Sequence, residues 1–380
     1  MSEPIRVLQV MATLDRGGAE AVVMDWLRRI DKEQVTFDFA VNSDAGPYAF
    51  EAEAVRLGAR IIRAPRFKLW NTISYSAWWY RCLKKHPEWL IVHAHHTVPA
   101  FAYLSVARLL GRVTIAHSHS ASHPGRLGKW ARWAMTLPLR WVAHYRLACS
   151  TPAATWMFGR RAETSLVHNG VALDEFEYDA QNRDRVRKEL GLGDGLVVGH
   201  VGRMVPPKNH ARLVQVFERS TEVEPFAHLL LVGDGELRSE IERHIRALKI
   251  DENVILVGVR ADVSALLAAM DVLVLPSHFE GLPVSIVEAQ ASGLPCVVSD
   301  AVTREVGLTD LVQFISLEES DEVWSNAVLK AKELPRRSRV EELRAAGYDS
   351  SETTGEMQRL YVKLWAAPVV AERKSEGIHD

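Results

Sequence analysis

The chain has 380 residues, 47% of them hydrophobic, which is long enough for two domains with sizeable cores. The formal net charge of −2 gives no overall indication of nucleic-acid binding. Three cysteines without metal-binding or redox spacing (Cys82, Cys149 and Cys296), a short polar start and the lack of an apolar run of about 20 residues favour a cytoplasmic protein.

The first 171 residues alternate between short apolar strands and amphipathic helices. This alternation predicts a parallel, doubly wound sheet in an α/β domain. The predicted strands span 5–11, 35–41, 60–65, 90–96, 113–119, 145–150 and 164–171, and predicted helices span 19–30, 47–59 and 100–111.

A polar stretch from about Ala172 to Gly195 follows, and then the same pattern begins again. In open α/β sheets the ligand lies at the carboxyl ends of the strands, so two such halves facing each other would form a cleft. The second half has predicted strands at 196–203, 227–235, 253–259, 271–277 and 295–300 and predicted helices at 209–220, 236–248, 262–269 and 283–292, and a long amphipathic helix at 352–366 ends the pattern.

In the first half, the run "DRGGAE" places Gly17 and Gly18 between the first strand and the first helix. The backbone there can approach a phosphate or a sugar closely. The glycine turns "VGDGE" and "VGV" also follow strands in the second half, and Gly233 and Gly258 could border a flat base. A plain turn explains each of these segments equally well.

Two predicted strands of the first half end in histidines, and a sixth histidine follows the second of these strands. Alternate residues of a strand point to one side, so "HAHH" and "HSHS" offer pairs of imidazoles that invite a metal-site interpretation. No carboxylate is interleaved with them, which favours contact with a sugar or with developing charge, with His117 as the best candidate. A purely structural role is the remaining alternative. The six are His93, His95, His96, His117, His119 and His123.

Residues 126–146 combine tryptophans and basic residues with apolar ones and contain no acid. Such a segment can lie on an anionic membrane surface. A helix pair that buries its tryptophans in its own domain is the alternative.

In the run "HVGRMVPPKNH", a strand leads to Gly202 and Arg203, and a Pro-Pro turn then leads to Lys208. Two cations at a strand end and a loop end suit a diphosphate leaving group, whose charge grows as the bond to it breaks. Ion pairs on an exposed loop are the alternative interpretation.

The run "EGLPVSIVEAQASG" contains two glutamates eight positions apart, Glu280 in a loop and Glu288 inside a helix. Gly281 allows a tight turn and Pro283 suits the first turn of a helix, whose N-terminus favours an anion such as a diphosphate. Two acceptors on either side of a diphosphate suit the hydroxyl groups of a nucleotide sugar. The alternative is an ordinary helix with surface glutamates.

With these residues in place, the chain resembles the retaining GT-B glycosyltransferases of family 4 over nearly its whole length. The resemblance is carried by the segments "LDRGGAE", "AHSHS", "HNGV", "VGRMVPPKNH", "LVGDGE" and "PSHFEGLPVSIVEAQASGLP". The amino-acid sequence is most similar to the branch of the family that assembles bacterial exopolysaccharide. It implies two Rossmann-like domains, 1–171 and 172–351, facing a central cleft. It also implies a final helix, at about 352–380, that returns to the first domain.

The resemblance implies a role for each matching residue. Glu280 would contact the donor sugar and Glu288 the ribose, Arg203 and Lys208 would hold the diphosphate, and His117 would lie near the C6 hydroxyl of the transferred sugar. No metal or other cofactor is expected, because the two cations do the work of Mg²⁺. Further donor contacts are expected from Gly17, Gly18, Gly202, Gly233, Gly258, Gly281, Leu282 and Pro283. One departure from the family pattern is the pair Pro206-Pro207 before Lys208.

The sequence therefore predicts a metal-independent hexosyltransferase acting from a nucleotide-diphosphate sugar, UDP favoured, on a glycan or lipid-linked acceptor. Expected partners are the donor, the acceptor and the cytoplasmic membrane face, and not nucleic acid. The alternatives are a nucleotide-sugar epimerase or hydrolase on the same fold, a non-catalytic sugar-nucleotide-binding protein, and, more remotely, a metal-dependent hydrolase built on the histidines.

Overall fold

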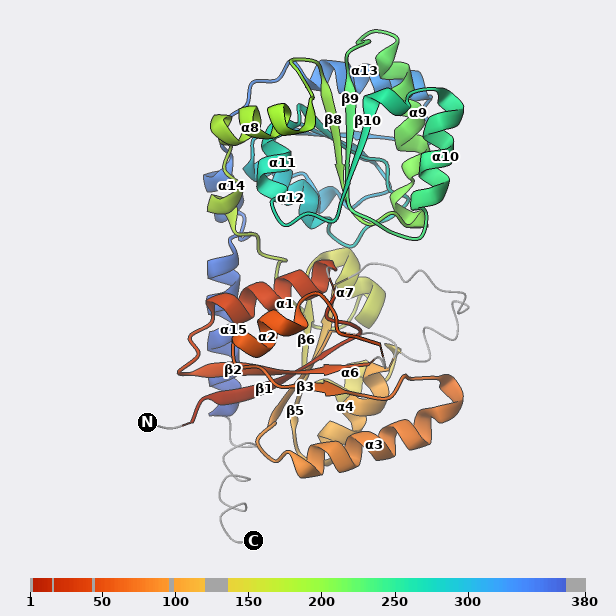
Figure 1. Ribbon diagram of the computed structural model, residues 1–380. Coiled ribbons are helices and arrows are strands. Elements are labelled where there is room, and N and C mark those ends of the chain that lie inside the picture. The colour runs from red at the N-terminus through yellow and green to blue at the C-terminus, as the bar shows by residue number, and fades with distance from the viewer. Residues whose placement is uncertain (1–2, 16, 43–44, 96–98, 120–135, 367–380) are drawn as a thin grey trace. The chain divides into compact units, whose positions relative to one another are not determined.

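The computed structural model describes residues 3–366 except 16, 43–44, 96–98 and 120–135, and these form two compact α/β units (Figure 1). The first unit consists of residues 1–170 and 350–380, and the second of residues 171–349. The chain therefore passes from one unit to the other twice, and the second unit is an insertion within the first. None of the described helices combines the length and the apolar character needed to span a bilayer.

In the first unit, the described strands form a parallel sheet in the order β3-β2-β1-β4-β5-β6-β7. Strand β1 pairs with β2 on one side and β4 on the other, so the winding reverses there and the loops at that edge diverge. Both faces of β1 and β2 are covered, which explains their nearly continuous apolar runs. The strands are β1 (Ile5–Met11), β2 (Val35–Val41), β3 (Ile61–Arg63), β4 (Ile91–Ala94), β5 (Val113–Ser118), β6 (Tyr145–Ala148) and β7 (Ser165–Leu166).

Two layers of helices bury the two faces of this sheet. One layer consists of α1, α2 and α15, and its core includes Trp26 and Tyr361. The other consists of α3, α4, α6 and α7, and its core includes Trp79, Tyr103 and Phe158. The helices are α1 (Gly18–Arg29), α2 (Glu51–Arg56), α3 (Thr72–Lys85, after a 3-10 turn at Leu69–Asn71), α4 (Ala100–Leu109), α6 (Leu139–Val142), α7 (Thr151–Phe158) and α15 (Ser350–Trp365).

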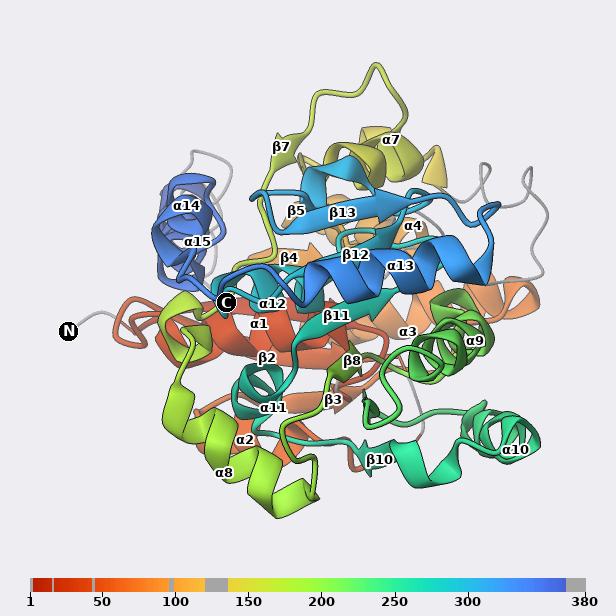
Figure 2. The ribbon, with the colours of Figure 1, turned by 90° about the horizontal axis from the view of Figure 1, so that it is seen from above.

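The second unit repeats this plan with a described parallel sheet in the order β10-β9-β8-β11-β12-β13. Figure 2 shows β13, β12, β11, β8 and β10 following one another across it. The strands are β8 (Val197–Val201), β9 (His228–Val232), β10 (Val254–Gly258), β11 (Val272–Leu275), β12 (Cys296–Ser299) and β13 (Val312–Ile315). The helices are α8 (Ala180–Leu190), α9 (His210–Thr221), α10 (Arg238–Leu248), α11 (Val263–Ala269), α12 (Val284–Ala291), α13 (Asp321–Ala331) and α14 (Val340–Ala345).

Several elements differ from the sequence-based expectation. The polar stretch 172–195 contains α8, which buries only Val186 and Arg187 and so lacks a clear apolar stripe. The short edge strand β13 and the aromatic helix α3 were not predicted. The predicted strand 164–171 shrinks to two residues. Of the basic tryptophan-containing segment 126–146, residues 126–135 lie outside the described part of the chain.

Candidate active site

Glu280 is positioned by the loop that follows β11. That strand is fully buried, and the loop after it leads through Pro283 into α12. The Glu280 carboxylate accepts a hydrogen bond from the Ser277 hydroxyl (2.9 Å) and pairs with the Lys208 ammonium group at 2.8 Å. Both partners of this ion pair are mostly buried, with 17% of the Glu280 side chain and 16% of the Lys208 side chain exposed. A ligand can therefore reach them.

Lys208 is positioned by the loop that follows β8, the strand next to β11. Pro206 and Pro207 form a 3-10 turn that ends at Lys208, and α9 begins two residues later. The backbone N–H of His278 donates to the Pro207 carbonyl oxygen (2.8 Å), which joins the two loops. Because β8 and β11 are neighbours, residues 72 positions apart in the chain meet at one edge of the sheet.

Arg203 lies in the same loop as Lys208 and is exposed. Within the described residues its guanidinium group forms no ion pair. Gly202 brings the chain close to Lys208, because a Cβ atom there would lie 3.0 Å from Lys208 Cε. One free cation and one paired cation thus follow β8, an arrangement suited to an anionic ligand.

Three of the predicted glycines lie at the carboxyl ends of β8, β9 and β10: Gly202 and Gly233 follow their strands, and Gly258 is the last residue of β10. Gly233 has φ +133°, and a Cβ atom there would lie 2.0 Å from the Gly202 carbonyl oxygen, so only glycine fits. The Gly233 N–H donates to the Gly258 carbonyl oxygen (2.8 Å), which connects the second turn to the third. Close backbone packing therefore accounts for Gly233 without any ligand.

Glu288 lies in the second turn of α12, between the buried residues Val287 and Ala289. Among the described residues, its half-buried carboxyl group has neither a hydrogen bond nor an ion pair. Burial raises the pKa of Glu288 from its usual 4.5 to about 7. Gly281, Leu282 and Pro283, which lead into this helix, are all buried. Glu288 is therefore not the ordinary surface glutamate that one sequence interpretation allowed.

Gly17 and Gly18 lie where expected, at the start of α1. Gly17 is the residue before the helix and has an extended conformation. A Cβ atom at Gly17 would come within 2.2 Å of a Glu20 carboxylate oxygen, whereas a Cβ atom at Gly18 would meet open space. The contact at Gly17 is with the far end of a flexible side chain, so both glycines leave the backbone accessible to a ligand.

Four of the six histidines form a cluster at the carboxyl ends of β4 and β5 in the first unit. His93, His95 and His117 are buried and His119 is partly buried, whereas His96 and His123 lie outside the described residues. His117 is only 1% exposed, and neither of its ring nitrogens has a partner in the described part of the chain. Its ring stacks on Trp26 and His119, at centroid distances of 5.9 and 4.1 Å. Two unpaired buried nitrogens make His117 the member of this cluster best able to accept or donate a hydrogen bond to a ligand.

The other histidines belong to a chain of hydrogen bonds that reaches α15. The Gln9 amide donates to the Tyr361 hydroxyl (3.1 Å), so the Gln9 carbonyl oxygen is left to accept from His95 Nε2 (2.8 Å). His95 Nδ1 is then an acceptor and receives a hydrogen bond from His119 Nε2, also at 2.8 Å. The Tyr361 hydroxyl in turn donates to His93 Nδ1 (2.8 Å). These bonds fit one set of ring tautomers. His119 Nδ1 also lies 3.2 Å from the Asn169 side-chain oxygen, and a neutral His119 that donates through Nε2 can keep this contact only with the Asn169 amide turned so that its NH2 group donates.

This cluster is held in the neutral state. Burial, reinforced by the neighbouring imidazoles, lowers the pKa of His93, His95 and His117 well below the usual value, and burial lowers the pKa of His119 to about 4. The ring nitrogens of His93, His95 and His117 come within 4.8 Å of one another, so these three could hold a metal ion. To do so, His95 would have to release Gln9 or His119, because both of its nitrogens are engaged.

Some residues of these sites were not singled out from the sequence. Gln9 is a polar residue within an apolar strand, which is a detectable signal. His200 and His210 begin and end the quoted Lys208 motif; both are buried, and burial lowers their pKa values, that of His210 to about 4. Tyr361 is 268 positions from His93 and carries no local signal.

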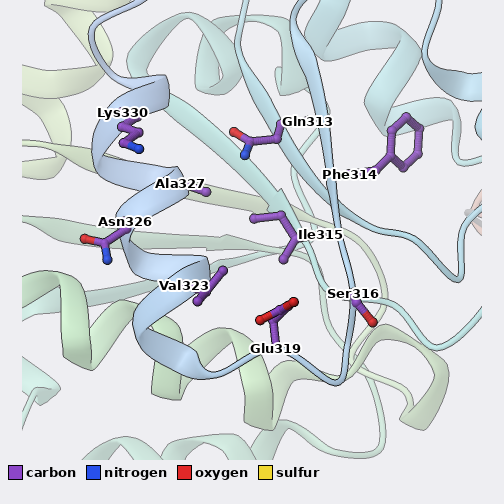
Figure 3. Close-up of a pocket in the computed structure, with 9 residues that line it drawn as sticks. All are labelled: Gln313, Phe314, Ile315, Ser316, Glu319, Val323, Asn326, Ala327 and Lys330. Carbon is purple, nitrogen blue, oxygen red and sulfur yellow. The ribbon is translucent and has the colours of Figure 1, made fainter.

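A separate hollow of about 460 Å³ lies on the second unit, between β13 and α13 (Figure 3). It is lined by residues 313–316, 319, 323, 326, 327 and 330, and none of the predicted site residues is among them. It borders the side of the edge strand β13, so it is not the site that the sequence predicts at the carboxyl ends of the strands.

Comparisons with known proteins show the family and the fold of the chain. The family described as "Glycosyltransferase Family 4" matches residues 16–175, and "Glycosyl transferases group 1" matches residues 182–349. The putative glycosyltransferase EpsF of Bacillus subtilis is 34% identical over 370 residues, covering 94% of this chain and 96% of that protein. An Escherichia coli enzyme named UDP-Gal:alpha-D-GlcNAc-diphosphoundecaprenol alpha-1,3-galactosyltransferase is 30% identical, covering 58% and 60% of the two chains. The structure of Anabaena Alr3699/HepE in complex with UDP-glucose has a TM-score of 0.73 at 19% identity and covers 98% and 99%, which shows a shared fold.

Proposed function

The chain belongs to the group 1 glycosyl transferases of family 4, and from that membership we propose that it transfers a hexose from a UDP-sugar to a glycan or lipid-linked acceptor, with retention at the anomeric carbon. The acceptor would be an intermediate of an exopolysaccharide or another cell-surface polysaccharide. The single observation that carries the proposal is the Lys208–Glu280 pair on two joined loops, with Arg203 exposed beside it.

In the proposed mechanism, Arg203 and Lys208 bind the diphosphate, and Glu280 binds hydroxyl groups of the donor sugar. The acceptor oxygen attacks the anomeric carbon on the face from which the diphosphate leaves, and the leaving oxygen takes the acceptor's proton. Negative charge grows on the diphosphate as the bond breaks, and two fixed cations stabilise it. Before the donor binds, Lys208 and Glu280 neutralise each other, so neither is buried as an unpaired charge.

Glu288 would accept hydrogen bonds from the ribose hydroxyl groups, and backbone groups of Gly281, Leu282 and Pro283 would lie near the diphosphate at the start of α12. On the first-domain side, Gly17 and Gly18 would border the donor. His117, neutral and with both nitrogens unpaired in the described structure, would contact the C6 hydroxyl group of the sugar. In this scheme the protein's own cations do the work, and turnover needs no metal.

The first experiment is a thermal-shift comparison of UDP, GDP, ADP and their sugar conjugates, with EDTA present. A ligand that binds only the folded state raises its stability, by about 2.7 kcal/mol at 100 times its Kd. Stabilisation by the uridine series alone supports the donor proposal. Stabilisation by guanosine nucleotides would replace UDP with GDP, and no shift at millimolar concentration would contradict the site.

The second experiment measures transfer with the variants Lys208→Ala and Glu280→Ala. Loss of a fixed charge that stabilises the transition state should lower kcat about 100-fold or more. Lys188→Ala and Glu240→Ala remove exposed charges from α8 and α10 and serve as matched controls. Activity like that of the wild type in either site variant would overturn the assignment, and donor consumption without acceptor would favour a hydrolase or an epimerase.

A further inference from the structure

A long part of the first unit is almost free of acidic residues. From Ala54 to Ala162 the sequence has 17 lysines and arginines and one acid, Glu88, so its formal charge is +16. The whole chain carries −2, which leaves −18 on the remaining residues. A charge asymmetry of this size indicates an anionic partner for this part of the molecule, even though the overall charge is close to neutral.

Helix α3 presents both apolar and basic side chains on its outward face. Its inward face buries Tyr75, Trp79 and Leu83 against the sheet. Trp70, in the 3-10 turn just before the helix, is 82% exposed, and Ile73, on the outward face of the helix, is 88% exposed. Their spacing continues at helical intervals through Ala77 and Tyr80 to Lys84. The basic residues in and beside this helix are Arg66, Lys68, Arg81, Lys84 and Lys85.

The adjacent helices extend this surface. Figure 1 shows α3 next to α4, and α4 in turn contacts α6. Leu109, at the end of α4, and Trp141, in α6, are 76% and 65% exposed. Single exposed apolar residues are common on proteins, but here the four most exposed large apolar side chains described for the first unit all lie on one layer of helices within its basic part. Trp70 and Ile73 lie where α3 begins, and Leu109 and Trp141 lie at the opposite end of this layer.

We propose that this α3–α4–α6 face, defined by Trp70, Ile73, Leu109, Trp141 and the basic residues around them, binds the surface of an anionic lipid bilayer. Exposed tryptophan and aliphatic side chains enter the boundary between headgroups and acyl chains, while lysines and arginines pair with anionic headgroups. A nucleic acid would explain the positive charge and could stack a base on Trp70, but it offers no partner for the exposed aliphatic side chains of Ile73 and Leu109.

The position of α3 connects this surface to the proposed reaction. In a parallel sheet the helix that follows a strand begins at the strand's carboxyl end, so Trp70 and Ile73, which follow β3, lie towards the edge where the histidine cluster lies. A bilayer at this face would therefore present a lipid-linked acceptor near that edge. This connection rests on the proposed function, whereas the binding of lipid itself does not.

Sedimentation of the full-length protein with vesicles tests the proposal without any measurement of activity. At about 50 mM salt, we expect binding to phosphatidylcholine vesicles that contain about 30% phosphatidylglycerol, and a large loss of binding near 1 M salt, where the Debye length falls to about 3 Å. The double variant Trp70→Glu/Ile73→Glu should lower the partition coefficient at least about tenfold, and so should Lys84→Glu/Lys85→Glu.

The double variant Val223→Glu/Phe226→Glu is the matched control, because these two residues are 66% and 81% exposed on the second unit. It should bind vesicles like the wild type, and all variants should keep the wild-type melting temperature. Failure of the wild type to bind anionic vesicles at low salt would overturn the proposal, as would equal binding by the Trp70/Ile73 variant. Two other results would also overturn the proposal if the wild type does not bind vesicles. One is a dimer that these substitutions dissociate, and the other is binding of the wild type to duplex DNA.

Discussion

The raised pKa of Glu288 makes the stability of the protein depend on pH. The Glu288 carboxyl group is half-buried and, within the described residues, unpaired, and burial raises its pKa to about 7. The folded state therefore holds a proton that the unfolded state releases near pH 4.5. Because the folded protein binds more protons between these values, the contribution of Glu288 to the free energy of unfolding falls as the pH rises from about 4.5 to about 7.

This behaviour gives a prediction for the variant Glu288→Gln. The variant should lack the part of the pH dependence of the free energy of unfolding that Glu288 causes, and should be more stable than the wild type at pH 8. If the carboxylate binds ribose, UDP affinity of the wild type should rise relative to that of the variant as the pH passes 7. Denaturant titrations and calorimetry over this pH range measure both effects. Parallel curves for the two proteins would contradict the prediction.

Tyr361 is the residue that connects α15 to the histidine cluster. The variant Tyr361→Phe leaves the Gln9 amide and His93 Nδ1 without their buried partner, so we expect a loss of about 1–3 kcal/mol in the free energy of unfolding. Tyr80→Phe removes a hydroxyl group from an exposed position and should change stability by less than about 0.5 kcal/mol. Urea titration of the three proteins measures the difference, and equal midpoints would contradict the hydrogen-bond chain.

At the scale of elements, the loops after β8, β9 and β10 depend on one another through their backbones. The variant Gly233→Ala combines an unfavourable φ with a 2.0 Å approach to the Gly202 carbonyl oxygen. We expect it to destabilise the protein by more than about 2 kcal/mol and to disturb the loop that carries Arg203. Gly191→Ala has a positive φ but meets nothing within 4 Å, so it should cost only about 1 kcal/mol. If both variants lose the same free energy of unfolding, backbone strain at a positive φ explains the loss, and the close approach to Gly202 contributes nothing.

The elements also show which parts of the fold the sequence could predict. Strands such as β1 and β2 were predictable because strands buried on both faces are continuous apolar runs. The mostly charged helix α8 was not, because much of its attachment is polar: Arg183 and Arg187 both bind Asp271, at 2.6 Å each, and Arg187 also binds three carbonyl groups. Because Asp271 is more than 80 positions from these arginines, the contact leaves no local pattern in the sequence of α8.

The candidate site also has parts that the sequence predicts and parts that it does not. Lys208 and Glu280 were predicted separately from motifs, and their meeting at 2.8 Å follows from the adjacency of β8 and β11. The neutral state of the histidines was not predictable, because it depends on burial and on the packing of the imidazoles against one another. The hydrogen bond from Tyr361 was not predictable either, because Tyr361 comes from the last helix. The roles proposed for Arg203, Glu288 and His117 stay predictions until a ligand is bound.

At the scale of the whole molecule, donor binding should slow amide hydrogen exchange in some segments of the chain and leave it unchanged in others. We expect UDP to slow amide hydrogen exchange in the loops after β8 and β11, around residues 202–209 and 277–284, because the proposed diphosphate contacts lie there. Exchange in α10, which lies outside the proposed contacts, should be unchanged and serves as an internal control. Protection confined to the hollow between β13 and α13 would place the nucleotide elsewhere.

The insertion of the second unit into the first has a consequence for synthesis on the ribosome. Helix α15 supplies Met357, Tyr361 and Leu364 to the core of the first unit, yet it is translated only after the whole second unit. At about 5–20 residues per second, the nascent first unit waits roughly 10 to 40 seconds for this helix. During that interval the second unit can fold, whereas the apolar face awaiting α15 stays open to chaperones.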